Sequence, residues 1–121
     1  ESTRHFVNAE TIARMKDGVT IINCARGELV NIPDMIRGIE TQKIGALALD
    51  VFDKEDGIYH ENRRDDILSN RDMAYLRQFP NVIMTQHMAF YTDAAVQSMV
   101  FCGIEGLCDF ARTGHTETEL V

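Results

Sequence analysis

Three side chains in this sequence are of types that can together bind a small carboxylic acid and transfer a proton to it: Arg26, Glu55 and His87. The planar guanidinium of an arginine binds a carboxylate through two parallel hydrogen bonds, a geometry that lysine cannot reproduce. Histidine titrates near neutral pH, so it can give a proton to an oxygen that gains negative charge. A glutamate that accepts from the other ring nitrogen fixes the tautomer and favours the protonated ring.

Taken one at a time, each of the three has an ordinary alternative role. Arginine is commonly exposed or ion-paired, Glu55 stands in the acidic stretch DKED, and a lone histidine is often a loop or core residue. Their shared feature is position, because each follows an apolar run. The carboxyl ends of parallel strands meet at one edge of a sheet, where ligands bind. Jointly, the three predict a site that adds a hydride to the carbonyl of a 2-keto acid.

The apolar runs that carry these residues predict a parallel β-sheet. They are continuously apolar rather than alternating, as in strands covered on both faces: VTIIN (19–23), IGALALDVF (44–52) and VIMT (82–85). Capping residues and helical periodicity predict four helices, at 9–16, from 33 onward, from about 70, and from 92 to about 112. The alternation of helices and strands indicates an α/β fold. Three strands make a small sheet and no GxGxxG turn occurs, so the chain resembles part of a larger domain.

Composition narrows the classes of protein and partner. The 121 residues are 45% hydrophobic, with a net charge of −7, which disfavours a nucleic-acid or anionic membrane surface. The apolar runs are shorter than the roughly 18 residues of a membrane span, and the start lacks a signal pattern, so we expect a cytoplasmic protein without a membrane partner. The three cysteines and four histidines show no metal-ligand spacing, so no metal site is predicted.

Beyond these patterns, the sequence resembles the D-2-hydroxyacid dehydrogenases, and within them the D-lactate dehydrogenase branch. The stretches that carry the resemblance are TRHFVNAETIARMKDG, INCARGELVN, ALDVFDKEDG, FPNVIMTQHMAFYT and the terminal TELV. The resemblance covers only the C-terminal third or so of a family member. It implies that residues 1–89 are the C-terminal half of a Rossmann-type NAD-binding domain with a doubly wound parallel sheet. Residues 90–121 would be a long helix and tail belonging to the substrate domain.

The resemblance also implies roles for the candidate residues. Arg26 would bind the substrate carboxylate, His87 would be the acid/base, and Glu55 would support it. Residues expected to line the cofactor site are Thr3, Cys24, Ala25, Arg26 and Asp50, the last beside the nicotinamide. Phe90 would be the aromatic residue of the substrate pocket, with simple core packing as the alternative. The sequence departs from many relatives at Gln86, where they have proline.

The function implied for the intact protein is an NAD-dependent D-lactate dehydrogenase that reduces pyruvate with NADH. Two alternatives remain open at this point. One is a dehydrogenase of a larger D-2-hydroxy acid, and the other is a non-catalytic dinucleotide-sensing or corepressor-type relative. The partner implied is a small 2-keto or 2-hydroxy acid, and the family implies a homodimer.

Overall fold

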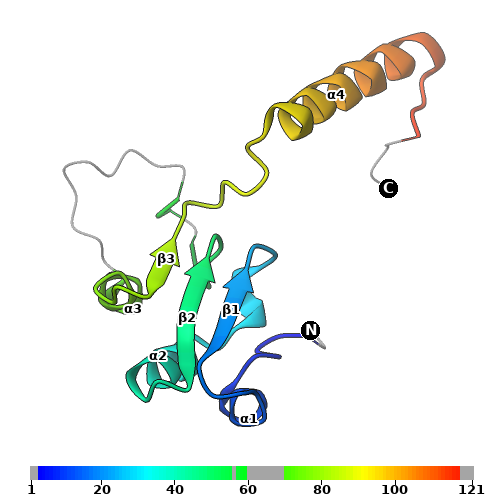
Figure 1. The fold of residues 1–121 in the computed structure, drawn as a ribbon. Helices are drawn as coiled ribbons and strands as arrows, with labels where there is room; N and C mark the ends of the chain where they lie inside the picture. Colours follow the sequence, from blue (N-terminus) through cyan, green and yellow to red (C-terminus); the bar gives the residue numbers. More distant parts are fainter. Residues whose placement is uncertain (1–2, 56, 60–69, 118–121) are drawn as a thin grey trace. The chain divides into compact units, whose positions relative to one another are not determined.

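A computed structural model describes residues 3–55, 57–59 and 70–117, and the chain divides into two compact units. The first unit spans Glu1–Met88 and contains the sheet, whereas the second spans Ala89–Val121 and contains one long helix (Figure 1). The stretch TELV and residues 60–69, which belong to a predicted surface segment, lie outside the described residues. That the second unit belongs to a substrate domain stays a prediction.

Three parallel strands form the sheet of the first unit, in the order β1-β2-β3 (Figure 1). The elements in chain order are α1 (Ala9–Ala13), β1 (Val19–Asn23), the 3₁₀ helix η1 (Gly27–Leu29), α2 (Ile32–Glu40), β2 (Ile44–Leu49), α3 (Arg71–Leu76), β3 (Val82–Met84) and α4 (Asp93–Thr113). The predicted α/β fold with a parallel sheet is therefore confirmed. The strand β2 ends at Leu49 rather than residue 52, since the chain bends at Asp50 and residues 51 and 52 lead out of the sheet to a turn where Lys54 has a left-handed φ of 60°.

Asparagine side chains begin each of the three α-helices described in the first unit. Asn8 accepts from the N–H of Thr11, Asn31 from that of Asp34, and Asn70 from that of Met73. Each cap satisfies a backbone N–H that the first helical turn leaves without an intrahelical partner, which contributes about 1 kcal/mol. Each of these helices therefore begins at a defined residue.

The hydrophobic core lies between the sheet and α2, which packs on β2 and is flanked by α1 and α3. Its fully buried members are Met35, Ile44, Leu47, Leu49, Met73 and Leu76, with Val30 and Val51. Each buried aliphatic side chain stabilises the fold by about 1.5–3 kcal/mol relative to an exposed one. This core fixes where the carboxyl ends of the strands stand.

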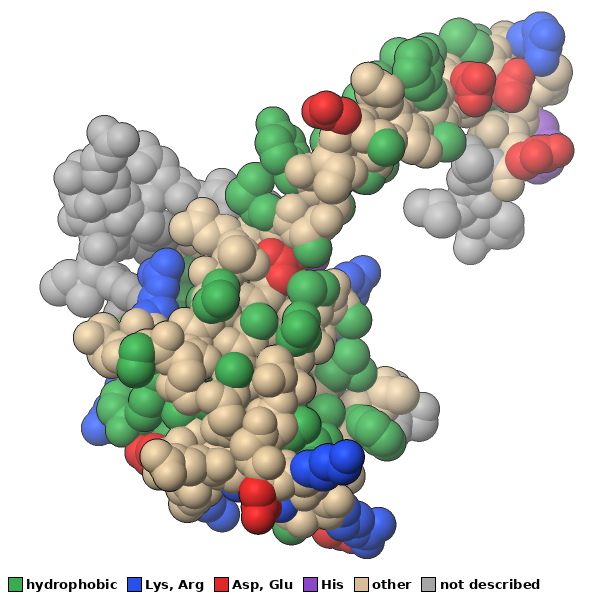
Figure 2. All heavy atoms as spheres, viewed as in Figure 1, with side chains coloured by type: hydrophobic (Ala, Val, Ile, Leu, Met, Phe, Trp, Pro, Cys, Tyr) green, Lys and Arg blue, Asp and Glu red, His purple; other side chains and the backbone are tan. Residues whose placement is uncertain are grey.

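The opposite face of the sheet is open within the described part of the chain. Ile22, Ala48 and Ile83 are in register across the three strands, and Ile22 and Ile83 are 68% and 66% exposed. Hydrophobic side chains are visible at the surface of this unit (Figure 2). The sequence pattern predicted that both faces of the sheet are buried. In the described residues, helices pack on one face only.

The second unit is built around α4, which begins after the N-cap Thr92 and ends at Gly114 with a left-handed φ of 73°. These bounds agree with the predicted helix. The apolar side chains predicted to share one face are mostly exposed in this unit: Val96, Met99, Val100, Ile104, Leu107 and Phe110. By length and composition alone α4 could cross a membrane, although core helices of soluble proteins pass the same test. The expectation of no membrane partner stays a prediction.

Candidate active site

His87 stands in the turn after β3, and the end of β2 holds its backbone. Its N–H donates to the carbonyl oxygen of Asp50 at 2.7 Å, and the next N–H, of Met88, donates to Oδ1 of Asp50 at 2.8 Å. The hydroxyl of Thr85 donates to the same oxygen at 2.5 Å. His87 has a left-handed φ of 55°, which is uncommon for a residue with a side chain. The turn is therefore held from outside by one buried aspartate.

Glu55, in the turn after β2, binds the imidazole of His87. Its Oε1 lies 2.6 Å from Nδ1 of His87, and its Oε2 accepts from the N–H of Phe52 at 2.9 Å. An ionised carboxylate only accepts hydrogen bonds, so Nδ1 of His87 carries the proton of this contact. The two side chains are 23% and 32% exposed, which shields the pair partly from water without closing it off.

The loop after β1 presents Arg26. The buried side chain of Asn23 accepts from the N–H of Ala25 at 3.1 Å and donates to the carbonyl of Arg26 at 2.8 Å, which closes a tight turn. Cys24, Ala25 and Arg26 are exposed on this turn. The Arg26 guanidinium donates to the Ala25 carbonyl at 2.7 Å and forms no ion pair among the residues that the structure describes. It is therefore accessible to an anionic ligand.

Gly27 brings the Arg26 loop against the turn that carries Glu55. A Cβ added at Gly27 would lie 2.2 Å from the carbonyl carbon of Phe52 and 2.4 Å from the backbone nitrogen of Asp53. Atoms cannot approach that closely, so only glycine fits. The loops after β1 and β2 are thus in direct backbone contact at this rim.

Residues before α1 lie alongside the loop after β1. The N–H of His5 donates to the Glu28 carbonyl at 2.7 Å, and the Arg4 guanidinium lies 3.8 Å from the Asp53 carboxylate. Thr3 is exposed at the start of this segment. Its segment therefore lies near the rim, while its contact with a dinucleotide stays a prediction.

Tyr59 lies close to the acidic groups of the rim. Burial raises the pKa of its phenol, the Glu55 carboxylate and, more weakly, Asp50 raise it further, and Arg77 opposes them. The phenol therefore stays neutral at physiological pH and adds no charge beside Glu55.

Phe90 belongs to the second unit, where its ring packs edge-on against Tyr91 with centroids 6.2 Å apart. Phe90 is 42% exposed, so it is not a core residue of that unit as described. Its predicted place in a substrate pocket stays a prediction.

The structure thus brings Glu55, His87 and Asp50 together and sets the Arg26 loop against them. Sequence reasoning missed three residues that hold this arrangement: Asn23, Gly27 and Thr85. The asparagine two residues before Ala25 is a signal of a side-chain-closed turn. Nothing in the local sequence pointed to the contact of Gly27 with Phe52 or of Thr85 with Asp50, since both join residues in segments that follow different strands.

The rim suits the nicotinamide end of a dinucleotide. Cys24 and Ala25 form an exposed, neutral edge next to the accessible Arg26, and Asp50 lies at the neighbouring strand end. No residues of this chain form the glycine-rich turn that would hold a pyrophosphate, because the sequence lacks GxGxxG. The residues present would therefore line only the nicotinamide half of the cofactor, and this role of Cys24, Ala25 and Asp50 stays a prediction. Among the described residues, no group of three or more His, Cys, Asp or Glu side chains could hold a metal ion.

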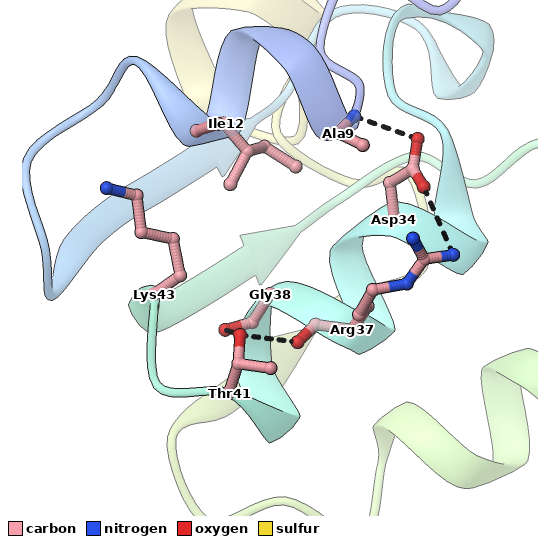
Figure 3. A pocket seen from close by; sticks show the side chains of 8 residues that line it. Ala9, Ile12, Asp34, Arg37, Gly38, Thr41 and Lys43 are labelled. Atoms are coloured by element: carbon pink, nitrogen blue, oxygen red, sulfur yellow. Dashed lines mark hydrogen bonds and ion pairs between the residues drawn. The ribbon is translucent and has the colours of Figure 1, made fainter.

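A separate cavity of about 370 Å³ lies between α1 and α2, away from these residues (Figure 3). It is lined by Ala9, Ile12, Ala13, Asp34, Arg37, Gly38, Thr41 and Lys43. Its charged groups are already partnered, since Asp34 lies 3.7 Å from Arg37 and Lys43 lies 2.6 Å from Asp17. This cavity therefore offers no unpaired cation for an anionic ligand.

Comparison with known proteins places these features in a family. The sequence model described as D-isomer specific 2-hydroxyacid dehydrogenase, NAD binding domain, matches residues 1–89. An aromatic 2-oxoacid reductase of Clostridium sporogenes is 41% identical over 117 residues, which are 97% of this chain and 35% of that protein.

Two solved structures share the fold over nearly the whole chain. A D-lactate dehydrogenase from Treponema pallidum is 30% identical with a TM-score of 0.95, covering 100% of this chain and 37% of that one. The NAD complex of a D-isomer specific 2-hydroxyacid dehydrogenase from Lactobacillus delbrueckii ssp. bulgaricus is 28% identical with a TM-score of 0.88, covering 99% and 36%. The chain spans about a third of the length of the proteins it matches.

Proposed function

Because the chain belongs to the D-isomer specific 2-hydroxyacid dehydrogenases and matches their NAD binding domain, we propose that it is the C-terminal third of an NAD-dependent enzyme that reduces a 2-oxo acid to the D-2-hydroxy acid. The observation that carries this proposal is the 2.6 Å contact between Glu55 and Nδ1 of His87, at the same rim as Arg26. It supplies a proton donor with a fixed tautomer beside an accessible carboxylate anchor.

Each of the three residues has a defined part in the proposed reduction. The Arg26 guanidinium holds the substrate carboxylate through two hydrogen bonds and so orients the adjacent carbonyl. His87 donates a proton from Nε2 to the carbonyl oxygen as negative charge develops there. Glu55 stabilises the imidazolium before that transfer and keeps the ring in place. When bound, the dinucleotide supplies the hydride.

The residues proposed to face the cofactor would border its binding site and take no part in the chemical step. Cys24 and Ala25 would bound the cofactor beside Arg26, and Thr3 would approach it from the segment before α1. Asp50 has a second task besides lying near the nicotinamide, because its Oδ1 already accepts from Thr85 and Met88. We also propose that the intact enzyme is a cytoplasmic homodimer, as the family resemblance implies.

Pyruvate is the substrate we propose first, supported by the fold similarity to a D-lactate dehydrogenase. We also propose that Phe90 is the aromatic residue of the substrate pocket. A larger aromatic 2-oxo acid is the second candidate. It is favoured by the 41% identity to an aromatic 2-oxoacid reductase. A non-catalytic dinucleotide sensor remains the alternative from another class.

The test uses the full-length protein that contains this chain. NADH oxidation is followed with pyruvate and with phenylpyruvate, and the product is resolved on a chiral column. Pyruvate turnover with D-lactate as product supports the first proposal, and a higher kcat/KM for phenylpyruvate selects the second. Binding of NADH without oxidation by either acid contradicts both and supports a sensor.

A further inference from the structure

We propose that Thr85 is a positioning residue for His87, acting through the carboxylate of Asp50; this inference rests on the proposed function. The Thr85 hydroxyl donates to Oδ1 of Asp50 at 2.5 Å, and the Met88 N–H donates to the same oxygen at 2.8 Å. Asp50 is only 4% exposed. Its carboxylate therefore depends on protein donors rather than on bulk water.

These bonds fasten the turn on both sides of His87. The N–H of Thr85 donates to the Leu49 carbonyl at 3.0 Å, and that of His87 donates to the Asp50 carbonyl at 2.7 Å. Residues 85, 87 and 88 are thus all joined to Leu49, the last residue of β2, or to Asp50, which follows it. The left-handed φ of 55° at His87 needs such restraint, because a residue with a Cβ rarely adopts it without support.

Gln86 does not supply that restraint. It is exposed, and no hydrogen bond to it is found among the residues that the structure describes. A glutamine also leaves φ unrestricted, whereas proline would lock it. The bonds to Leu49 and Asp50 therefore restrain the backbone of this turn.

The Thr85 hydroxyl matters for chemistry because the imidazole has to stay aligned with two partners. Nδ1 lies 2.6 Å from Glu55, and Nε2 must face the substrate carbonyl. Loss of the hydroxyl removes one of the donors to Oδ1 and lets the Asp50 carboxylate rotate away from the Met88 N–H. A small displacement of a proton donor lowers the rate of the chemical step more than it lowers the affinity for the cofactor.

The first experiment compares Thr85→Val, which keeps the shape and removes the hydroxyl, with Thr85→Ser, which restores it. In the full-length enzyme we expect Thr85→Val to lower kcat about 10- to 100-fold and to leave the KM for NADH within about twofold. Thr85→Ser should recover most of the rate. Thr20→Val, at an exposed threonine of β1, is the matched control and should behave as the parent.

Three results overturn the inference. They are an unchanged kcat in Thr85→Val, a rise in the KM for NADH alone, and a Thr85→Ser enzyme as slow as Thr85→Val.

A second experiment does not depend on turnover. Hydrogen exchange of the His87 and Met88 amides should be about tenfold faster in Thr85→Val than in the parent, and slow again in Thr85→Ser. Equal exchange in all three proteins overturns the positioning role, whatever the activity. If the parent oxidises no NADH with any 2-oxo acid but the exchange differs as expected, the proposed function fails and the restraint of the turn stands. Should Thr85→Val not fold, the exchange and kinetics of Thr85→Ala against Thr85→Ser decide the question.

Discussion

Oε1 of Glu55 lies 2.6 Å from Nδ1 of His87, across 32 positions of sequence, while Oε2 of the same carboxylate accepts from the Phe52 N–H. Both partners are donors, so the carboxylate is needed as an acceptor twice. A glutamine amide offers one accepting oxygen and a donating NH₂ group, so it can serve only one of them.

Glu55→Gln should therefore weaken the hold on the imidazole of His87. In the full-length enzyme we expect kcat/KM for the 2-oxo acid to fall about tenfold or more, because the ring is no longer held in place. Steady-state kinetics measure the loss, with Glu105→Gln on α4 as the charge-matched control. An unchanged kcat/KM in Glu55→Gln contradicts the assigned pair.

Arg26→Lys should weaken the binding and orientation of the 2-oxo acid. Lysine keeps the positive charge but cannot form two parallel hydrogen bonds with a carboxylate. We expect kcat/KM for the acid to fall about 10- to 100-fold, with little change in the KM for NADH. Steady-state kinetics provide the measurement. Arg37→Lys, at an exposed arginine of α2, is the control, and equal kinetics for Arg26→Lys and the parent refute the carboxylate role.

Gly27→Ala should destabilise the protein, because its new Cβ would meet the backbone of Phe52 and Asp53 within 2.4 Å. Backbone cannot give way as the end of a side chain can, so we expect a loss of about 2 kcal/mol or more in the free energy of unfolding. Urea denaturation measures it. The control is Gly103→Ala in α4, where a Cβ meets nothing within 4 Å and alanine favours the helix by about 0.5–1 kcal/mol. Two variants of equal stability would show that the loop contact is loose.

Alkaline pH should destabilise the protein through Tyr59. Its pKa is raised above the ordinary value of 10.0, chiefly by burial and then by the Glu55 carboxylate. A group whose pKa is higher in the folded state contributes stability that is full below its unfolded pKa and is lost as the pH rises through the folded one. We expect urea midpoints to fall above pH about 10, and less so in Tyr59→Phe. Tyr91→Phe, at an exposed ring, is the control; an identical fall in Tyr59→Phe and the parent excludes this cause.

The 121-residue chain by itself should bind NADH weakly. It has the rim proposed for the nicotinamide end but no glycine-rich turn for the pyrophosphate, where much dinucleotide affinity arises. Calorimetry should give a Kd weaker than about 100 µM. Micromolar binding would mean that this half of the domain is sufficient.

The sequence predicted the parallel α/β fold, the long helix and the residues of the rim, because apolar runs and helix caps are local signals. Family membership and NAD as the cofactor, expected from the resemblance, agree with the matched NAD binding domain. It did not predict the restraint of His87 by Thr85 and Asp50, or the need for glycine at position 27. Those contacts join residues in segments that follow different strands, and no local pattern encodes which loops will touch. The open second face of the sheet was missed for a related reason. An apolar strand pattern predicts that a face is buried, but it does not identify the segment that packs on it.

That open face has a practical consequence for the chain produced alone. Ile22, Ala48 and Ile83 form an apolar row across strands whose outer members, β1 and β3, have no further strand beside them within the described residues. Flat apolar surfaces next to unpaired strand edges are templates for sheet-to-sheet stacking between molecules. A preparation of the isolated chain is therefore expected to be colloidally unstable and to cloud on concentration. Mild detergent or an added hydrophilic fusion partner would be needed to keep it in solution.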